Sequence, residues 1–331
     1  MLARLLSNDF PRNRVLAVIL VALLLALAFA PFLFPGVKAL SVAAKVLVFI
    51  VLVASFDLLL GYTGIVSFAH TMFFGIGAYG IAIASTRMGP GWPALAVGLL
   101  VALALSFVLS LCIGLFSLRV KAIFFAMITL AVATAFQTLA SQLSETPFLG
   151  VMLDGRLLCY YLLFFTALLL LLAMLRVVNS PFGRVLQAIR ENEFRAEAIG
   201  YRVVVYRTTS SVLSALFATL AGAMLAIWLR YNGPDTSLSF DLMLEVLLIV
   251  VIGGMGTIYG AAIGASLFVV AQSYLQDLLQ VASNATAGWP WLSALLSPDR
   301  WLLWLGLLFV LSVYYFPSGV VGRLRAMRPH A

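Results

Sequence analysis

The sequence predicts an all-α, polytopic integral membrane protein with about ten transmembrane helices, on the basis of composition and hydropathy. Hydrophobic residues make up 64% of the 331 residues and charged residues only 10%, and the mean hydropathy is +1.12. A soluble domain of this length needs more charge to cover its surface. Apolar runs of about 20 residues recur along the whole chain, and each is long enough to cross about 30 Å of hydrocarbon.

These runs are expected to be helices, because backbone polar groups inside lipid must be satisfied within the segment. They are too apolar and too long to be the alternating strands of an outer-membrane barrel. The eighth and ninth are separated only by a glycine-rich stretch, so a single broken element is the alternative there. The runs cover residues 15–34, 39–60, 62–86, 93–117, 122–143, 157–177, 208–229, 241–258, 260–281 and 301–316.

The distribution of Lys and Arg predicts the orientation, because cytoplasmic loops carry an excess of both residues. With the N-terminus in the cytoplasm, ten crossings return the C-terminus to the same side, and 14 of the 20 basic residues lie inside. The net charge of +8 is therefore read as a topology signal and not as a nucleic-acid site. The inner group comprises Arg4, Arg12, Arg14, Arg119, Lys121, Arg176, Arg184, Arg190, Arg195, Arg202, Arg207, Arg323, Arg325 and Arg328, and the outer group Lys38, Lys45, Arg87, Arg156, Arg230 and Arg300.

The connection at residues 178–207 is the one long and strongly charged loop that the sequence predicts, and it lies on the cytoplasmic side. Ser180 is a suitable helix N-cap and Pro181 suits the first helical position. Apolar residues then recur at the spacing of an amphipathic helix, at Phe182, Val185, Leu186 and Ile189. A break at Asn192 and Glu193 predicts a second short helix that ends before Gly200. The residues alone fit two interpretations, a docking element for a cytoplasmic partner or an ordinary surface loop.

Glycines are concentrated in the third run and between the eighth and ninth runs. Interrupted helices in corresponding places of two halves indicate a central substrate path in transporters, whereas close helix packing explains the same glycines without a path. The candidate path residues are Gly61, Gly64, Ser67, His70, Gly75, Gly253, Gly254 and Gly256.

Few ionisable residues fall inside the apolar runs, where charge is expensive. The stem of Lys45 is expected to extend outward to the interface, and Asp57, Glu245 and Asp277 are placed near helix ends. His70 is expected to be a neutral histidine that hydrogen-bonds a neighbouring helix. The two cysteines, Cys112 and Cys159, have no metal-ligand spacing and are expected to be ordinary apolar side chains.

Three stretches resemble the branched-chain amino acid ABC transporter permease family, over about Lys38 to Gly322. The cytoplasmic loop, with Ser180–Arg184, Ala188–Glu193 and Ala196–Gly200, is similar to the loop that holds the coupling helix in that family. The family also carries a stretch like Gly64-x-x-Ser67-x-x-His70 and one like Gly253-Gly254-x-Gly256. This chain departs from the family pattern at Ile65 and Ala69, and its loop at 144–156 is short.

The resemblance implies an ABC importer permease fold with two related halves, in one transmembrane domain over residues 1–331 that contains the 178–207 loop. It also implies two ABC ATPase subunits that bind ATP and Mg, a second related permease, a periplasmic or lipid-anchored solute-binding protein, and a bacterial inner membrane whose lipid surrounds the helices. No cofactor or metal is expected on this chain. The coupling residues carried over from the loop are Arg184, Arg190, Glu191, Asn192, Glu193, Glu197 and Gly200.

The chain has no Gly-x-x-x-x-Gly-Lys-Ser/Thr phosphate loop, so it is not expected to be an enzyme, and ATP hydrolysis must occur on separate subunits. Branched-chain amino acids fit the resemblance best, and urea or short amides are the alternative solutes. A secondary transporter or channel that works without ATPases is the rival of a different class. A polytopic membrane enzyme would need a cluster of His, Asp or Ser at one membrane face, which the sequence does not offer.

Overall fold

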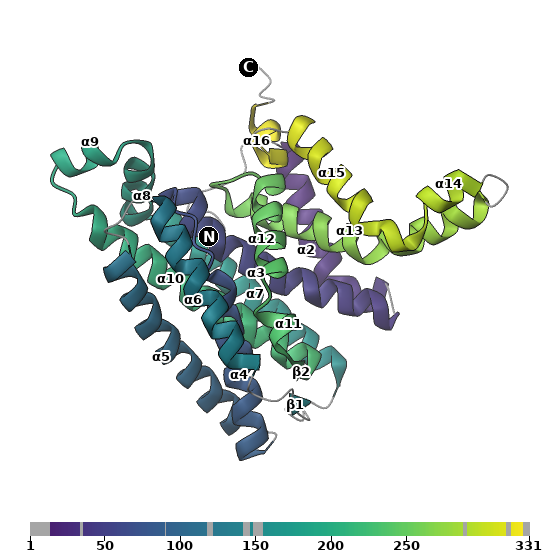
Figure 1. The fold of residues 1–331 in the computed structure, drawn as a ribbon, viewed down its shortest axis with the longest axis horizontal. Helices are drawn as coiled ribbons and strands as arrows, with labels where there is room; N and C mark the ends of the chain where they lie inside the picture. Colours follow the sequence, from purple (N-terminus) through teal and green to yellow (C-terminus); the bar gives the residue numbers. More distant parts are fainter. Residues whose placement is uncertain are drawn as a thin grey trace.

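The computed structural model describes residues 14–33, 36–89, 91–117, 122–141, 146–147, 155–286, 290–315 and 319–326, and nearly all of them are helical (Figure 1). The long helices are α2 (Arg14–Leu33), α3 (Val37–Thr63), α4 (His70–Met88), α5 (Trp92–Ser117), α6 (Ala122–Ser141), α7 (Arg156–Val178), α10 (Val203–Leu229), α12 (Phe240–Gly253), α13 (Ile258–Ala285) and α15 (Trp301–Tyr315). The short elements are β1 (Thr146–Pro147), α8 (Pro181–Glu191), α9 (Glu193–Ala198), β2 (Tyr231–Asn232), α11 (Pro234–Ser237), α14 (Pro290–Leu295), the 3₁₀ turn η1 (Pro298–Arg300) and α16 (Gly319–Ala326).

Each of the ten predicted apolar runs overlaps one of these long helices. Seven spans in the described part of the chain are long and apolar enough to cross a membrane, and the stretch Phe124–Ala140 of α6 is a shorter apolar helix. The all-α, multi-pass character is therefore confirmed, while the count of ten crossings and the two related halves stay predictions. Five residues of the predicted inner charge group lie outside the described residues: Arg4, Arg12, Arg119, Lys121 and Arg328.

The third predicted run differs most from the structure, because its first residues are not helical. Gly64 ends α3 in a left-handed conformation with φ of 74°, and its N–H bonds back to the carbonyls of the last turn of α3. Residues 64–69 are then non-helical, and α4 begins only at His70. The glycine-rich stretch between the eighth and ninth runs is a turn between two separate helices, so the broken-element alternative is wrong.

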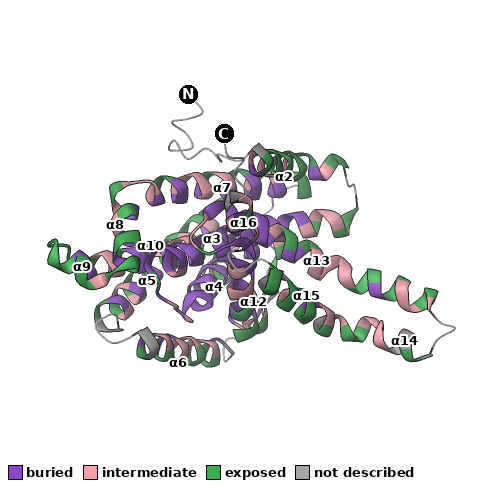
Figure 2. Cartoon of the chain, turned by 90° about the horizontal axis from the view of Figure 1, so that it is seen from above, coloured by how far each residue is buried: buried purple, intermediate pink, exposed green. Residues whose placement is uncertain are grey.

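The core is centred on α3, where nearly every residue from Ala43 to Leu59 is buried. Figure 2 shows α3 and α4 in the buried centre and α2 and α6 at the periphery. The α5 helix exposes large apolar side chains such as Leu100 and Val101, which are 67% and 60% exposed. A face of this kind is unfavourable in water and suits contact with lipid.

Helices α4 and α10 approach closely because glycines face backbone at two crossing points. A Cβ on Gly77 would meet the Thr219 carbonyl, and a Cβ on Gly222 would meet the Phe74 carbonyl. Small residues of this kind let helices in membranes pack backbone to backbone. The α4–α10 pair is thereby fixed as a rigid unit beside α3.

The chain has two distinct ends. One holds α8 and α9, the turn between α12 and α13, and α16, whose Val321 packs with Leu16 of α2 and Ile263 of α13. The other holds the antiparallel pair β1–β2, in which Thr146 is paired with Asn232. The first and last described helices therefore meet at the α8–α9 end, as an even number of crossings requires, and α13, α14 and α15 project to one side as an arm (Figure 1).

Candidate functional site

The connection after α7 folds into two capped helices. The Ser180 hydroxyl accepts a hydrogen bond from the Gly183 N–H at 3.4 Å, and the Asn192 side chain accepts from the Arg195 N–H at 2.9 Å. Each contact satisfies a backbone donor at a helix start. The helix–break–helix prediction is confirmed, although the second helix begins one residue early, at Glu193.

Apolar side chains hold the α8–α9 element against the rest of the protein. Leu186, Ile189 and Ala196 are buried, and the Phe182 ring stacks on Tyr206 of α10 with centroids 5.7 Å apart. The four apolar positions predicted from helical spacing thus all lie on the inward side. The element is therefore a rigid projection attached to α7 and α10.

Six of the seven predicted coupling residues divide into two groups. Arg184, Glu191, Glu197 and Gly200 are exposed at the end of the molecule and are available to a partner. Glu193 instead accepts a hydrogen bond from Arg207 at 2.7 Å, and Asn192 caps α9, so these two stabilise the element itself.

The seventh residue, Arg190, is exposed on α8 and also contacts the end of α3. Its Nη1 donates to the Gly61 carbonyl at the end of α3. A side chain that crosses from α8 to α3 ties the projecting element to the central helix. The docking role of the loop stays a prediction, whereas its attachment to α3 is a feature of the fold.

Exposed apolar side chains on α9 were not singled out from the sequence. Phe194 is 84% exposed and Ile199 is 70% exposed. Exposed aromatic and aliphatic residues at a tip outside the spans favour burial against another protein. Their signal in the sequence was one large apolar residue within a short polar helix, Phe194, and a second directly after it, at the C-cap Ile199.

The end of α3 and the α12–α13 turn form a junction directly beneath α8. Asp57 is buried, and its Oδ1 accepts a hydrogen bond from the Gly256 N–H at 2.8 Å. Thr257 then caps α13 by accepting from the Gly260 N–H at 3.2 Å. Gly256 has φ of +79°, which favours glycine at this turn. We name the set of Asp57, Gly61, Arg190 and Gly256 the junction.

The eight candidate path residues therefore do not form one group. Gly61, Gly64 and Gly256 lie beside Arg190, and Gly254 contacts Gly319. Gly253 packs against Gly260, and Gly75 faces the side chain of Leu238. Close packing explains Gly61, Gly75 and Gly253. A positive φ explains Gly64, Gly254 and Gly256. A role in lining a path stays a prediction.

Ser67, in the non-helical segment before α4, and His70, the first residue of α4, are both buried. The His70 Nε2 lies 2.9 Å from the Ser55 hydroxyl of α3, and the ring packs against Phe56 with centroids 5.2 Å apart. A histidine that hydrogen-bonds a neighbouring helix was the expectation for this residue. The contact places the entry of α4 against the middle of α3.

Lys45 has a polar partner on a neighbouring helix, and the outward extension of its stem stays a prediction. Its Nζ donates to Gln272 Oε1 of α13 at 2.9 Å, and Gln272 Nε2 donates to Glu245 Oε1 of α12 at 2.8 Å. We name these three residues the polar triad. Nearer the end of α3, Lys38 forms a separate, exposed ion pair with Asp277.

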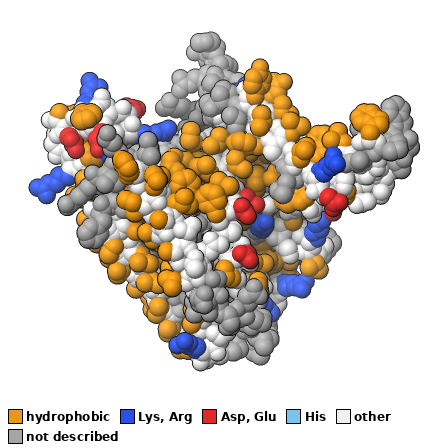
Figure 3. Space-filling model, in the orientation of Figure 1, with side chains coloured by type: hydrophobic (Ala, Val, Ile, Leu, Met, Phe, Trp, Pro, Cys, Tyr) orange, Lys and Arg blue, Asp and Glu red, His pale blue; other side chains and the backbone are white. Residues whose placement is uncertain are grey.

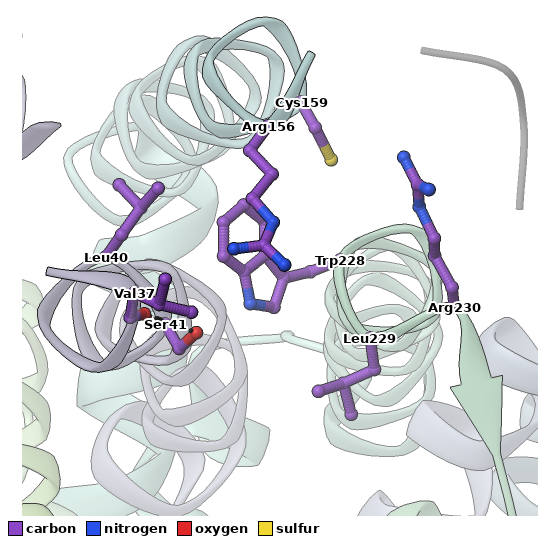
Figure 4. Close-up of a pocket in the computed structure, with 8 residues that line it drawn as sticks. All are labelled: Val37, Leu40, Ser41, Arg156, Cys159, Trp228, Leu229 and Arg230. Carbon is purple, nitrogen blue, oxygen red and sulfur yellow. Dashed lines mark hydrogen bonds between the residues drawn. The ribbon is translucent and has the colours of Figure 1, made fainter. Parts of the chain in front are cut away.

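A basic cavity of about 290 Å³ opens at the end opposite α8, between the ends of α3, α7 and α10. Figure 4 shows Arg156, Trp228 and Ser41 among its lining residues, with Arg230 at its rim. The lining residues include no carboxylate. Two of the four predicted outer arginines, Arg156 and Arg230, therefore come together at one opening.

A multi-pass helical membrane protein with a capped, charged projection at one end has the features of a transport permease. The comparisons with known proteins agree: the model of the family "branched-chain amino acid transport system / permease component" matches residues 38–313, and the chain belongs to this family. Membership also places it among transport subunits of ABC systems and not among enzymes.

Two curated relatives are named as high-affinity branched-chain amino acid transport system permease proteins LivM. The Escherichia coli protein is 26% identical over 92% of this chain and 75% of its own length. The Salmonella typhimurium protein is 26% identical over 86% of this chain and 70% of its own length. A probable LivM of Methanocaldococcus jannaschii is 29% identical over 49% of this chain and 45% of its own length. No solved structure matches the chain.

Proposed function

We propose that this chain is the permease subunit of an ABC importer that moves branched-chain amino acids across the bacterial inner membrane by ATP-driven alternating access. The observation that carries the proposal is the α8–α9 projection, which is outside the spans, capped at both helix starts and joined to α3 by Arg190. Force applied to such an element reaches the central helix without passing through a flexible loop.

The energy in this proposal enters through residues 178–207. Two ABC ATPase subunits hold ATP and Mg, and their closure moves the projection of this chain and of a second, related permease. The exposed Arg184, Glu191 and Glu197 supply charge for docking, and the exposed Phe194 supplies apolar area. The chain itself binds no cofactor.

The opposite end faces the solute-binding protein, periplasmic or lipid-anchored, in the same proposal. Both termini and the α8–α9 end are then cytoplasmic, in line with the excess of arginine in the inner loops. The names of the curated relatives favour branched-chain amino acids over urea or short amides as the solute.

Reconstitution tests the proposal. The chain is co-expressed with the ATPase pair, the second permease and the binding protein, and leucine uptake into proteoliposomes is measured with and without ATP and vanadate. The expected result is ATP-dependent, vanadate-sensitive uptake and co-purification of the ATPases. Uptake by the permeases alone, at the same rate, would show a secondary transporter instead.

A charge reversal tests the docking element. Glu197→Arg is expected to lower ATPase co-purification, because the exposed side chain lies on the projection, while Lys38→Glu at the opposite end leaves co-purification unchanged. Equal co-purification of both variants would contradict the assignment of the projection.

A further inference from the structure

The polar triad brings opposite charges together at membrane depth. Lys45 lies eight residues after the start of α3 at Val37, which places it about 12 Å along the helix axis. Glu245 and Gln272 lie within α12 and α13, both of which belong to predicted spans. All three side chains are half-buried, so they border the surface of the chain.

A surface that carries these charges does not suit contact with lipid. Charged side chains in membrane spans almost always face the interior of a bundle or a water-filled cavity. Figure 3 shows acidic and basic side chains close together in the middle of one face, near α12, with hydrophobic side chains around them. This face therefore points toward the translocation path or toward the second permease.

The two charges of the triad are kept apart by a neutral amide. The described residues form salt bridges at Lys38–Asp277 and Arg207–Glu193, and neither bridge includes Lys45 or Glu245. The Lys45 ammonium has three donors. Within the described part of the chain it bonds Gln272 and lies 5.3 Å from the centroid of the Phe49 ring. Both charged groups thus retain hydrogen-bonding capacity toward the surface.

The amide of Gln272 has the polarity of a zwitterion. Its oxygen accepts from the Lys45 ammonium and its NH₂ group donates to the Glu245 carboxylate. The head group of an α-amino acid offers the same two partners in the same order, a carboxylate for Lys45 and an ammonium for Glu245. Asp241, exposed one turn before Glu245 on α12, adds negative charge on the ammonium side.

We propose that Lys45 and Glu245 bind the α-carboxylate and the α-ammonium group of a zwitterionic amino acid during its passage, and that Gln272 bridges them when no solute is present. The branched side chain then rests on the hydrophobic surface around the triad. The identity of the solute class rests on the proposed function, whereas the pairing of charges rests on the geometry of the triad.

Solute-dependent stability tests the site on the permeases alone, without the ATPases. The purified permease pair is heated with leucine, with 4-methylpentanoate, which lacks the ammonium, with isopentylamine, which lacks the carboxylate, or with urea. Gln272→Ala removes the amide that competes with solute, so leucine should stabilise this variant at concentrations about tenfold lower than the wild type. The two singly charged analogues and urea should stabilise neither protein.

Transport then separates binding from a structural role. In the double variant Lys45→Met/Glu245→Gln both charges are neutralised, so no unpaired charge remains to disrupt packing. We expect this variant to assemble and to keep binding-protein-stimulated ATP hydrolysis. Leucine uptake per ATP should fall by at least about tenfold, because the loss of one charged hydrogen bond alone has about that effect. Lys38→Met, on the same helix, is the matched control and should retain uptake.

The outcomes that overturn the site are distinct from those that overturn the proposed function. Normal uptake by the double variant, equal stabilisation by leucine and its singly charged analogues, or loss of permease pairing in the double variant would each refute solute binding at the triad. The last result would assign the triad to the interface with the second permease. Absence of ATP-dependent uptake by the wild type, with leucine stabilisation intact, would refute only the proposed function.

Discussion

Asp57 is predicted to fasten the α12–α13 turn to α3 through one hydrogen bond. Its Oδ1 accepts from the Gly256 N–H at 2.8 Å, while its Oδ2 has no hydrogen-bond partner among the described residues. Asp57→Asn and Asp57→Ala both remove the buried charge, and the asparagine alone keeps an oxygen in the place of Oδ1. The two variants therefore differ mainly in the acceptor for Gly256.

The magnitude follows from the burial of this contact, because Asp57 is only 1% exposed. A buried donor left without an acceptor costs about 1–3 kcal/mol. We therefore expect Asp57→Ala to be less stable than Asp57→Asn by about that amount. The measurement is the temperature at which half of the detergent-solubilised protein loses its monodisperse elution peak.

Coincident midpoints for the two Asp57 variants would refute the reasoning, because they would show that the hydrogen bond does not hold the turn. ATPase coupling provides a second readout in the assembled importer. Asp57→Asn should keep stimulation by the binding protein, and Asp57→Ala should lose part of it, since the turn lies directly beneath α8. An equal loss in both variants would instead assign the effect to the charge.

Three further outcomes follow from the helix contacts. Gly222→Ala should destabilise the protein by about 1–3 kcal/mol through overpacking against α4. In the same heating assay the control Gly306→Ala should be neutral or slightly stabilising, because a Cβ added there meets nothing within 4 Å. Equal effects of the two substitutions would contradict the close approach of α4 and α10. Arg190→Met should lower the ratio of solute transported to ATP hydrolysed, because the link to α3 is lost. The control Arg195→Met, at an exposed position on α9, should keep this ratio. An unchanged ratio in both variants would contradict the link. Ser180→Ala should destabilise α8 by about 0.5–2 kcal/mol, because the helix loses its N-cap. The measurement is the rate of tryptic cleavage within residues 181–191, which should rise. An unchanged rate would show that the cap is dispensable.

Local features of the α8–α9 element could be predicted because their causes are local. A side chain that caps a helix acts three residues along the chain, as Ser180 does on Gly183 and Asn192 does on Arg195. The inward apolar side of α8 follows from helical periodicity. The resemblance of this loop and of the glycine-rich stretches to one family was also confirmed, because family motifs reside in contiguous residues.

Contacts between distant parts of the chain could not be predicted in the same way. Arg190 and Gly61 are 129 positions apart, and Lys45 and Gln272 are 227 positions apart. Helical periodicity describes one helix at a time, so it could not reveal the contact of Arg190 with the end of α3. The position of Lys45 within one apolar run could not reveal Gln272, because the polar partner lies on another helix.

The junction and the polar triad both join α3 to the hairpin of α12 and α13, and this gives the proposed coupling a physical route. α3 carries Asp57 near one end and Lys45 twelve residues earlier, about 18 Å along the axis. The α12–α13 hairpin carries Gly256 at its turn and Glu245 and Gln272 farther along its two helices. Displacement of α8 acts on α3 through Arg190, and the Asp57 contact fixes the hairpin turn to α3 at that end. A rotation of α3 relative to the hairpin about this contact would change the separation of Lys45 from Glu245, so the same motion that follows ATP hydrolysis can open or close the proposed solute site.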